Sequence, residues 1–252
     1  MDQQTASDVV NAALSDDRVA LLYDEVNALS SIKVIPSEDA YWGSSTDSSG
    51  TTILIAPTAY PAESLYHELL HASMKLNGYR QYLTLLRTVD GNVPRLVAEA
   101  LDNELQHHRM FPLFVAKGFD STRFYHDGDD KTYSSIRHEL KRMKPKKTSA
   151  AEYFMKYLSI MAPGGAGGDD ERSKLDQFFR NSVPSDKLRK VHAAAEKVRN
   201  WSVSETLDPG PTIIEILGVL GDLEGWWIGT SQDFPTAGYF TGPSFQLYEV
   251  KF

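Results

Sequence analysis

The chain has 252 residues and contains no cysteine. Without thiols it can form neither disulfide bonds nor zinc sites of the cysteine type, and it cannot use a cysteine nucleophile. It also lacks both a run of about twenty apolar residues and a basic, apolar N-terminal leader. The sequence therefore predicts a soluble cytoplasmic protein that does not cross a membrane. Export by a route that reads no cleavable signal would leave the same pattern and stays open.

Positive charge is scarce, because 26 Lys and Arg residues stand against 34 Asp and Glu residues and the formal net charge is −8. Proteins that bind nucleic acids need a basic surface that displaces counterions, so the composition argues against a nucleic acid partner. We interpret the one basic run, residues 141–147, as a solvated loop. The hydrophobic content of 41% is that of an ordinary globular protein.

The segment His67-Glu68-Leu69-Leu70-His71 is the most informative part of the chain. Two helical residues four positions apart lie about 40° apart around the axis, so both imidazoles point the same way. Two neutral histidines supply two ligands of a Zn²⁺ site, while the glutamate stays off the metal and handles the proton of a water molecule that the metal activates. The sequence predicts His67 and His71 as zinc ligands and Glu68 as the catalytic base and acid.

Residues 61–78 are expected to form the helix that carries this motif. Pro61 suits its first position, Glu63 complements the N-terminal end of the helix dipole, and Gly78 suits its end. The stripe opposite the histidines is apolar and consists of Leu65, Leu69, Ala72 and Leu76. Because that stripe supplies the core contacts, we expect the histidines to face a cleft.

Residues 51–56 are β-branched and apolar, follow a Ser/Gly turn cluster, and predict a strand that leads into the motif helix. With this strand, the motif resembles the zincin metallopeptidases over about residues 30–110. The resemblance implies an α+β unit with a small sheet, an active-site helix and a third-ligand helix. It also implies an edge strand that holds an extended substrate by main-chain pairing, and hydrolysis of a peptide or protein substrate.

The third metal ligand distinguishes the zincin subgroups. Metzincins need a glycine and a histidine at the positions of Met74 and Asn77, so that branch is excluded. Gluzincins take a glutamate from a later helix, and residues 94–108 predict such a helix here. We therefore expect a gluzincin-like site.

That later helix offers three possible third ligands. Glu99 ranks first, because the chain here looks like ImmA/IrrE-type zincins, in which a Glu-Ala pair on the next helix carries the ligand; Asn103 would then orient a histidine. Glu104 ranks second, because a carboxylate within an apolar arc needs a cation or a hydrogen-bond partner. His107 ranks third and lies two turns beyond Glu99 on the same side of the helix.

Hydrolysis also develops negative charge on the substrate carbonyl oxygen, which needs a second donor besides the metal. The residues that could supply it are His107, His108, Arg109, Tyr125, His126 and Tyr133. Two other functions stay open, namely a non-catalytic zincin-fold sensor or protein-interaction module, and a zinc hydrolase of a non-peptide amide or ester. The intact Glu68 argues against the sensor.

Residues 1–128 are predicted to form the zincin-like catalytic unit, and residues 129–252 a mainly helical region that packs on it as one compact body. In the first region, helical periodicity covers about residues 6–30, and a short strand is expected at residues 32–36.

In the second region, Ser185 is predicted to cap a helix and the glycine-rich residues 163–168 to form a flexible connector. The helices expected there cover residues 132–143, 150–161, 172–181, 185–201 and 212–223. The aromatic tail beyond them is expected to contribute to packing. The oligomeric state is not predicted.

Overall fold

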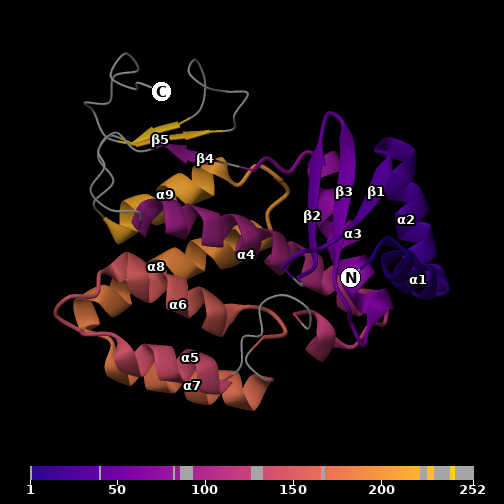
Figure 1. Ribbon diagram of the computed structural model, residues 1–252. Coiled ribbons are helices and arrows are strands. Elements are labelled where there is room, and N and C mark those ends of the chain that lie inside the picture. Colours follow the sequence, from indigo (N-terminus) through magenta and orange to yellow (C-terminus); the bar gives the residue numbers. More distant parts are fainter. Residues whose placement is uncertain are drawn as a thin grey trace. The chain divides into compact units, whose positions relative to one another are not determined.

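The computed structural model describes residues 2–39, 41–81, 83–85, 93–125, 133–165, 168–221, 226–229 and 239–241. These residues are mostly helical and include two small sheets, so the fold class is α+β, as predicted (Figure 1). Among them, no helix combines the length and apolar character that crossing a membrane requires.

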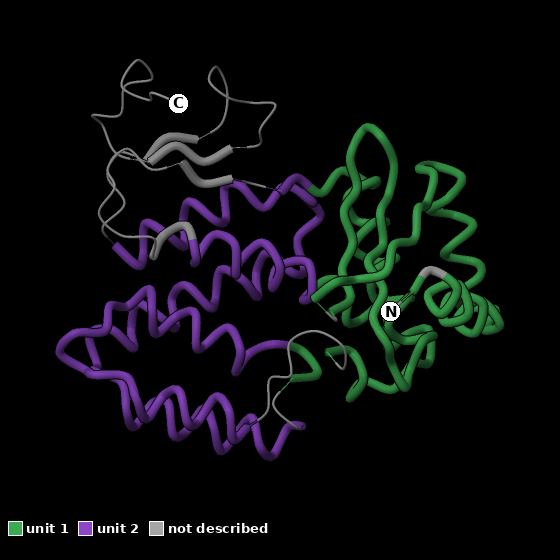
Figure 2. Tube along the Cα trace, in the orientation of Figure 1, with its two compact units in different colours: residues 1–79, 109–131, 163–165 green, residues 80–108, 132–162, 166–252 purple. Residues whose placement is uncertain are grey.

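The chain divides into two compact units (Figure 2). Unit 1 comprises residues 1–79, 109–131 and 163–165, and unit 2 comprises residues 80–108, 132–162 and 166–252. Residues 80–108 thus cluster with the later part of the chain, although they precede the division expected at residue 128. The packing of the whole chain as one body stays a prediction.

Unit 1 begins with two helices, α1 (Gln3–Leu14) and α2 (Asp17–Leu29), where helical periodicity extends over about residues 6–30. The break falls at Asp16, whose backbone is extended and whose carboxylate accepts a hydrogen bond from the backbone N–H of Arg18 at 2.9 Å. A side chain that satisfies a first-turn N–H starts a new helix, and this is why one periodic stretch gives two helices.

A three-stranded sheet follows, with strand order β1-β3-β2. Strand β1 (Ile32–Pro36) runs parallel to β3 (Gly50–Ile55), and both agree with the strands expected from the sequence. Strand β2 (Gly43–Asp47) runs antiparallel to β3 and lies within the Ser/Gly cluster that was interpreted as a turn. The turn itself is confined to the two residues between β2 and β3.

Helix α3 (Pro61–Leu76) carries the histidine motif and begins at Pro61 as predicted. Gly78, two residues after its end, has a φ of 104°, a conformation that favours glycine. On its apolar stripe, Leu65, Leu69 and Ala72 are fully buried and Leu76 is half-buried. The helix packs against α1, α2 and β2, so the apolar stripe does supply core contacts.

Helix α4 (Val93–Ala116) extends two turns beyond the predicted end and contains Pro112. Its residues 93–108 belong to unit 2 and its residues 109–116 to unit 1. A short 3₁₀ turn, η1 (Ser121–Arg123), follows in unit 1. Unit 1 therefore receives the end of α4 and the turn after it.

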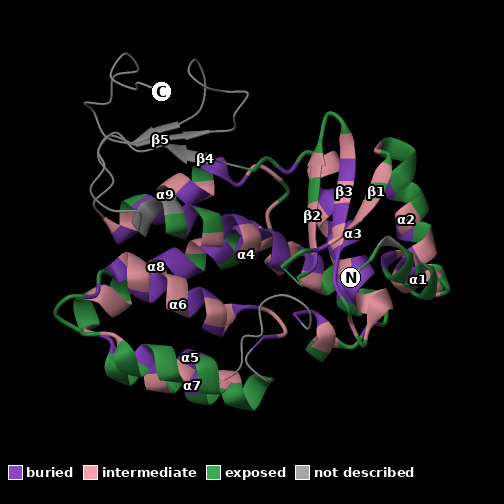
Figure 3. Cartoon of the chain, in the orientation of Figure 1, coloured by how far each residue is buried: buried purple, intermediate pink, exposed green. Residues whose placement is uncertain are grey.

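Unit 2 adds five further helices in the described part of the chain, at or near the predicted positions. They are α5 (Tyr133–Arg142), α6 (Ala150–Met161), α7 (Asp169–Ser182), α8 (Ser185–Ser202) and α9 (Gly210–Leu220). Each has a buried stripe along an otherwise exposed or half-buried surface (Figure 3). The unit also contains a small antiparallel sheet of β4 (Leu83–Leu85), β5 (Trp226–Gly229) and β6 (Tyr239–Thr241), which was not predicted.

The predicted cap of α8 needs correction, and part of the predicted flexible connector is closely packed. Pro184, and not Ser185, is the N-cap of α8, because the carbonyl of Pro184 accepts the N–H of Leu188 at 2.8 Å and Ser185 already lies inside the helix. Gly164 is closely packed, since a Cβ there would meet Phe111 Cε2 at 2.6 Å and the Ser121 carbonyl oxygen at 2.8 Å. Of the expected connector, residues 166 and 167 lie outside the described residues.

Candidate metal centre

His67 and His71 lie one turn apart on α3, and both are half-buried. Their Nε2 atoms are 3.2 Å apart. With Zn–N bonds of about 2.0–2.1 Å, two ligands of a tetrahedral zinc ion lie about 3.3 Å from each other. The pair thus has the nitrogen separation that one shared zinc ion requires.

The ring of His67 packs on Phe124, with ring centroids 4.5 Å apart and an interplanar angle of 49°. Phe124 is only 2% exposed and belongs to an aromatic cluster in unit 1. The other members of the cluster are Tyr66, Phe111, Phe114, Phe119 and Tyr125. A packed aromatic neighbour restricts the rotamers of the imidazole and so helps to hold it in one orientation.

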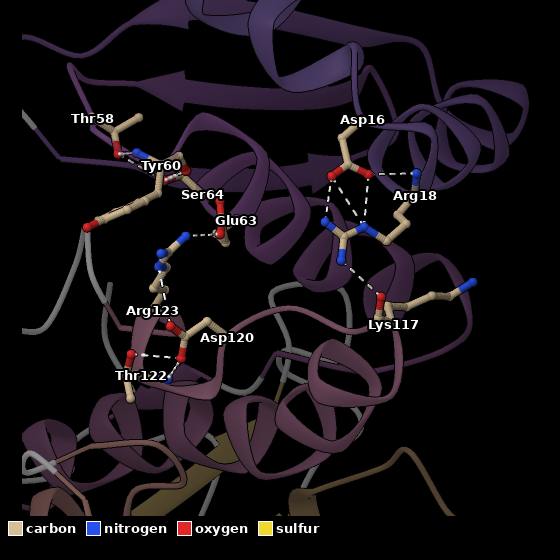
Figure 4. Close-up of polar contacts among 10 residues, drawn as sticks. All are labelled: Asp16, Arg18, Thr58, Tyr60, Glu63, Ser64, Lys117, Asp120, Thr122 and Arg123. Carbon is tan, nitrogen blue, oxygen red and sulfur yellow. Dashed lines mark hydrogen bonds and ion pairs between the residues drawn. The ribbon is translucent and has the colours of Figure 1, made fainter.

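Polar contacts tie the turn that carries Phe124 to the first turn of α3 (Figure 4). The guanidinium of Arg123 donates to Glu63 Oε1 at 2.7 Å and lies 4.1 Å from the centre of the Tyr60 ring. Asp120 caps the turn by accepting the N–H of Thr122 at 3.0 Å, and this hydrogen bond lowers the pKa of Asp120 below its usual value. Residues 120–124 are thereby held beside α3.

Helix α4 brings a third imidazole. Phe111 and Phe114 on this helix both pack on Phe124, and Phe114 also packs on Tyr66 of α3. Residues 107, 111 and 114 share one face of a helix, because they are spaced by four and three positions. His107 therefore lies on the face of α4 that carries these anchors, one and two turns before them.

Among the described residues, His67, His71 and His107 form a group of side chains that could hold a metal ion, with one donor atom from each and all three within 4.8 Å of one another. Three neutral imidazoles suit Zn²⁺, and a fourth position would remain for water or substrate. His107 is buried and the other two are half-buried. The donor set and its spacing therefore fit the predicted zinc ion.

The other predicted site residues take different places. Glu68 is buried on α3, with an exposure of 6%. Glu99, the first choice as third ligand, is exposed and not in the histidine group; it precedes His107 by eight residues, or about 12 Å along the helix axis. Glu104 is not in the group either, but it is buried and has a carboxylate oxygen 4.0 Å from His107 Nδ1. The half-buried Asn103 lies one turn before His107.

The proposed second donors are scattered. Arg109 is half-buried, and burial lowers the pKa of its guanidinium. Tyr125 is buried and packs edge-on against Phe124. Tyr133 begins α5 in unit 2, and His126 lies outside the described residues. The positions of these side chains do not favour any one of them as the second donor to the substrate carbonyl oxygen.

Two features of the site were not predicted from the sequence. One is the aromatic cluster around Phe124, whose members come from three separate segments of the chain. The other is a run of buried polar residues on α4, consisting of Asp102, Glu104, Gln106 and His107. The run of buried polar residues is partly visible in the sequence, because Glu104 interrupts an otherwise apolar arc of the helix.

Comparisons with models of known protein families, with curated protein sequences and with solved structures found no match.

Proposed function

We propose that this protein is a zinc-dependent hydrolase of peptide bonds, in which His67, His71 and His107 bind the metal and Glu68 transfers protons. The observation that carries the proposal is the convergence of three imidazole nitrogens within 4.8 Å. Two of them, those of His67 and His71, come from α3, which also carries the buried Glu68 beside the first histidine. This arrangement is zincin-like in its motif helix and differs from gluzincins in having a histidine as the third ligand.

A bound Zn²⁺ would supply Lewis acidity, which polarises a carbonyl group and lowers the pKa of water from about 15.7 to about 7. Glu68 then acts as general base by accepting a proton from the attacking water. The same carboxyl group returns the proton to the leaving amine.

The edge strand β2 supports a peptide as the substrate class. In the part of the chain that the structure describes, β2 pairs only with β3, so its other edge can hydrogen-bond to an extended peptide. Helix α3 packs against β2, which brings the motif helix and this edge together within unit 1. A non-peptide amide or ester would have no use for such an edge.

The proposal is tested by metal analysis of the purified protein, followed by cleavage profiling on a peptide library. The wild-type protein should contain one zinc per chain and cleave peptides. Glu68→Gln should retain the zinc and lose cleavage by about 10²–10⁴-fold, because it removes only the proton-transfer group.

The alternatives give other results. Zinc without cleavage in the wild-type protein would favour a zincin-fold sensor, and cleavage of esters or non-peptide amides alone would redirect the substrate class. Absence of bound zinc after incubation with the metal would refute the metal centre. His138→Gln, at an exposed position on α5, is a matched control for changing a histidine outside the group.

A further inference from the structure

Helix α4 buries an unusual number of polar side chains in one short stretch. Asp102, Glu104, Gln106 and His107 are each at most 5% exposed. A carboxylate that leaves water without a partner is costly, so two buried carboxylates within three residues need an explanation. Positions 102 and 104 lie about 200° apart around the helix, so each needs partners of its own.

Asp102 has a partner within its own helix. Gln106 Nε2 donates to Asp102 Oδ2 and to the carbonyl oxygen of Asp102, both at 3.2 Å. This pair spans one turn and satisfies polar atoms that the surrounding side chains shield from water.

Glu104 lies beside His107, one turn earlier on α4. Its Oε1 atom is 4.0 Å from His107 Nδ1, which is an ion-pair distance and longer than a hydrogen bond. Both side chains are about 95% buried, so no bulk water competes for this contact.

We propose that Glu104 is a positioning residue that orients His107 for metal binding, an inference that rests on the function proposed above. A neutral imidazole has one N–H, and a carboxylate next to Nδ1 favours the tautomer in which Nδ1 carries it. The lone pair is then on Nε2, the atom that faces away from Glu104. Carboxylates that accept the second N–H of a ligand histidine fix its ring and raise its basicity.

The same geometry argues against Glu104 as a ligand itself. The carboxylate approaches the Nδ1 edge of the ring, whereas the proposed metal-binding atom is Nε2. A carboxylate held on the Nδ1 side acts through the ring, which explains why a buried acid is present beside the histidine group but not in it.

The test measures zinc affinity and the His107 tautomer separately. Zinc affinity is obtained by competition with a chromophoric chelator, and the tautomer from ¹⁵N shifts of the imidazole in the metal-free protein. Glu104→Ala should weaken zinc binding by about 10–100-fold and lose the Nδ1–H tautomer. Glu104→Gln should lose less of the affinity, since its amide oxygen still accepts a hydrogen bond from Nδ1.

Glu171→Gln, at an exposed position on α7, is the matched control and should leave both readouts unchanged. Circular dichroism establishes whether each variant folds. If Glu104→Ala does not fold, the near-isosteric Glu104→Gln is the variant that tests the role of Glu104. In that case, the glutamine variant must weaken zinc binding measurably for the inference to stand.

Three results would overturn the inference. The first is an unchanged zinc affinity in both Glu104 variants, and the second is an Nε2–H tautomer of His107 in the wild-type protein. The third is loss of zinc by Glu104→Ala while His107 keeps the Nδ1–H tautomer, which would make Glu104 a ligand. Failure of the wild-type protein to bind zinc would refute the proposed function instead. The tautomer and its response to Glu104→Ala would then still decide whether Glu104 orients the ring.

Discussion

The imidazole of His107 is expected to be essential for zinc binding. His107→Ala leaves two protein ligands, and the affinity for zinc should fall by more than about 100-fold. Glu99→Ala, which removes an exposed side chain outside the histidine group, should leave the affinity within about twofold. Competition with a chelator measures both. The opposite ranking, with Glu99 required and His107 dispensable, would restore the glutamate as third ligand.

A second histidine, His192 on α8, makes stability depend on pH. Its Nε2 atom is buried and, in the described part of the chain, has no hydrogen-bond partner. Burial lowers its pKa below the usual 6.5; the positive charges of Arg180 and Arg199 act in the same direction, and the negative charge of Asp176 opposes them without reversing the shift. The unfolded chain therefore binds this proton more readily than the folded protein, and stability should fall as the pH decreases from about 7 through the lowered pKa.

The expected result is a smaller loss of stability between pH 7.5 and 5.5 in His192→Gln than in the wild-type protein, measured by urea unfolding at both pH values. His138→Gln, at an exposed position, serves as the control and should behave as the wild type. Equal pH dependence in the His192 variant and the wild type would show that another group is responsible.

At the residue scale, local spacing predicted that the imidazoles of His67 and His71 lie close together, as they do. It did not show that His107, ranked third among the possible ligands, would be the side chain that joins them. The spacing of the motif acts within one turn, so helix geometry alone places its side chains. Which turn of α4 approaches the pair depends instead on the aromatic anchors Phe111 and Phe114, and their partners come from distant segments. Glu99 was ranked first on the resemblance to ImmA/IrrE-type zincins, which carries no information about that contact.

At the scale of single elements, the stability of helix α2 depends on its N-cap residue, Asp16. Asp16→Ala removes the hydrogen bond to the Arg18 N–H and the ion pair with the Arg18 guanidinium, whose closest atoms are 2.6 Å apart. The free energy of unfolding should fall by about 1 kcal/mol, the usual cost of losing a helix cap. Urea unfolding measures it. Asp24→Ala, an exposed position in the same helix, should change it by less than about 0.5 kcal/mol, and equal effects would exclude the capping role.

Helices were predicted well and strand β2 was not, for a physical reason. Helix α6 begins and ends at the predicted residues, because apolar spacing and a capping box of Ser149 and Glu152 mark it locally. Strand β2 is rich in Ser and Gly and has no apolar alternation to reveal it. Its conformation comes from main-chain pairing with β3, which a residue pattern does not show.

For the whole molecule, the order of segments limits where the chain can be cut. Residues 80–108 belong to unit 2, and Val97, Leu101 and Leu105 within them are fully buried. A fragment of residues 1–128 would keep these side chains but lose the rest of unit 2. We expect the fragment to bind the dye ANS and to lack a cooperative thermal transition. The full chain should not bind the dye and should melt cooperatively. A monomeric fragment that melts cooperatively without binding dye would support the division at residue 128.

One helix, α4, is shared by the two units, and this has a consequence for how the protein denatures. Its intrahelical hydrogen bonds continue from residues 93–108 into residues 109–116, so melting of either part frays the other. Calorimetry should therefore record a single heat-absorption peak, with equal van't Hoff and calorimetric enthalpies, and not one peak for each unit.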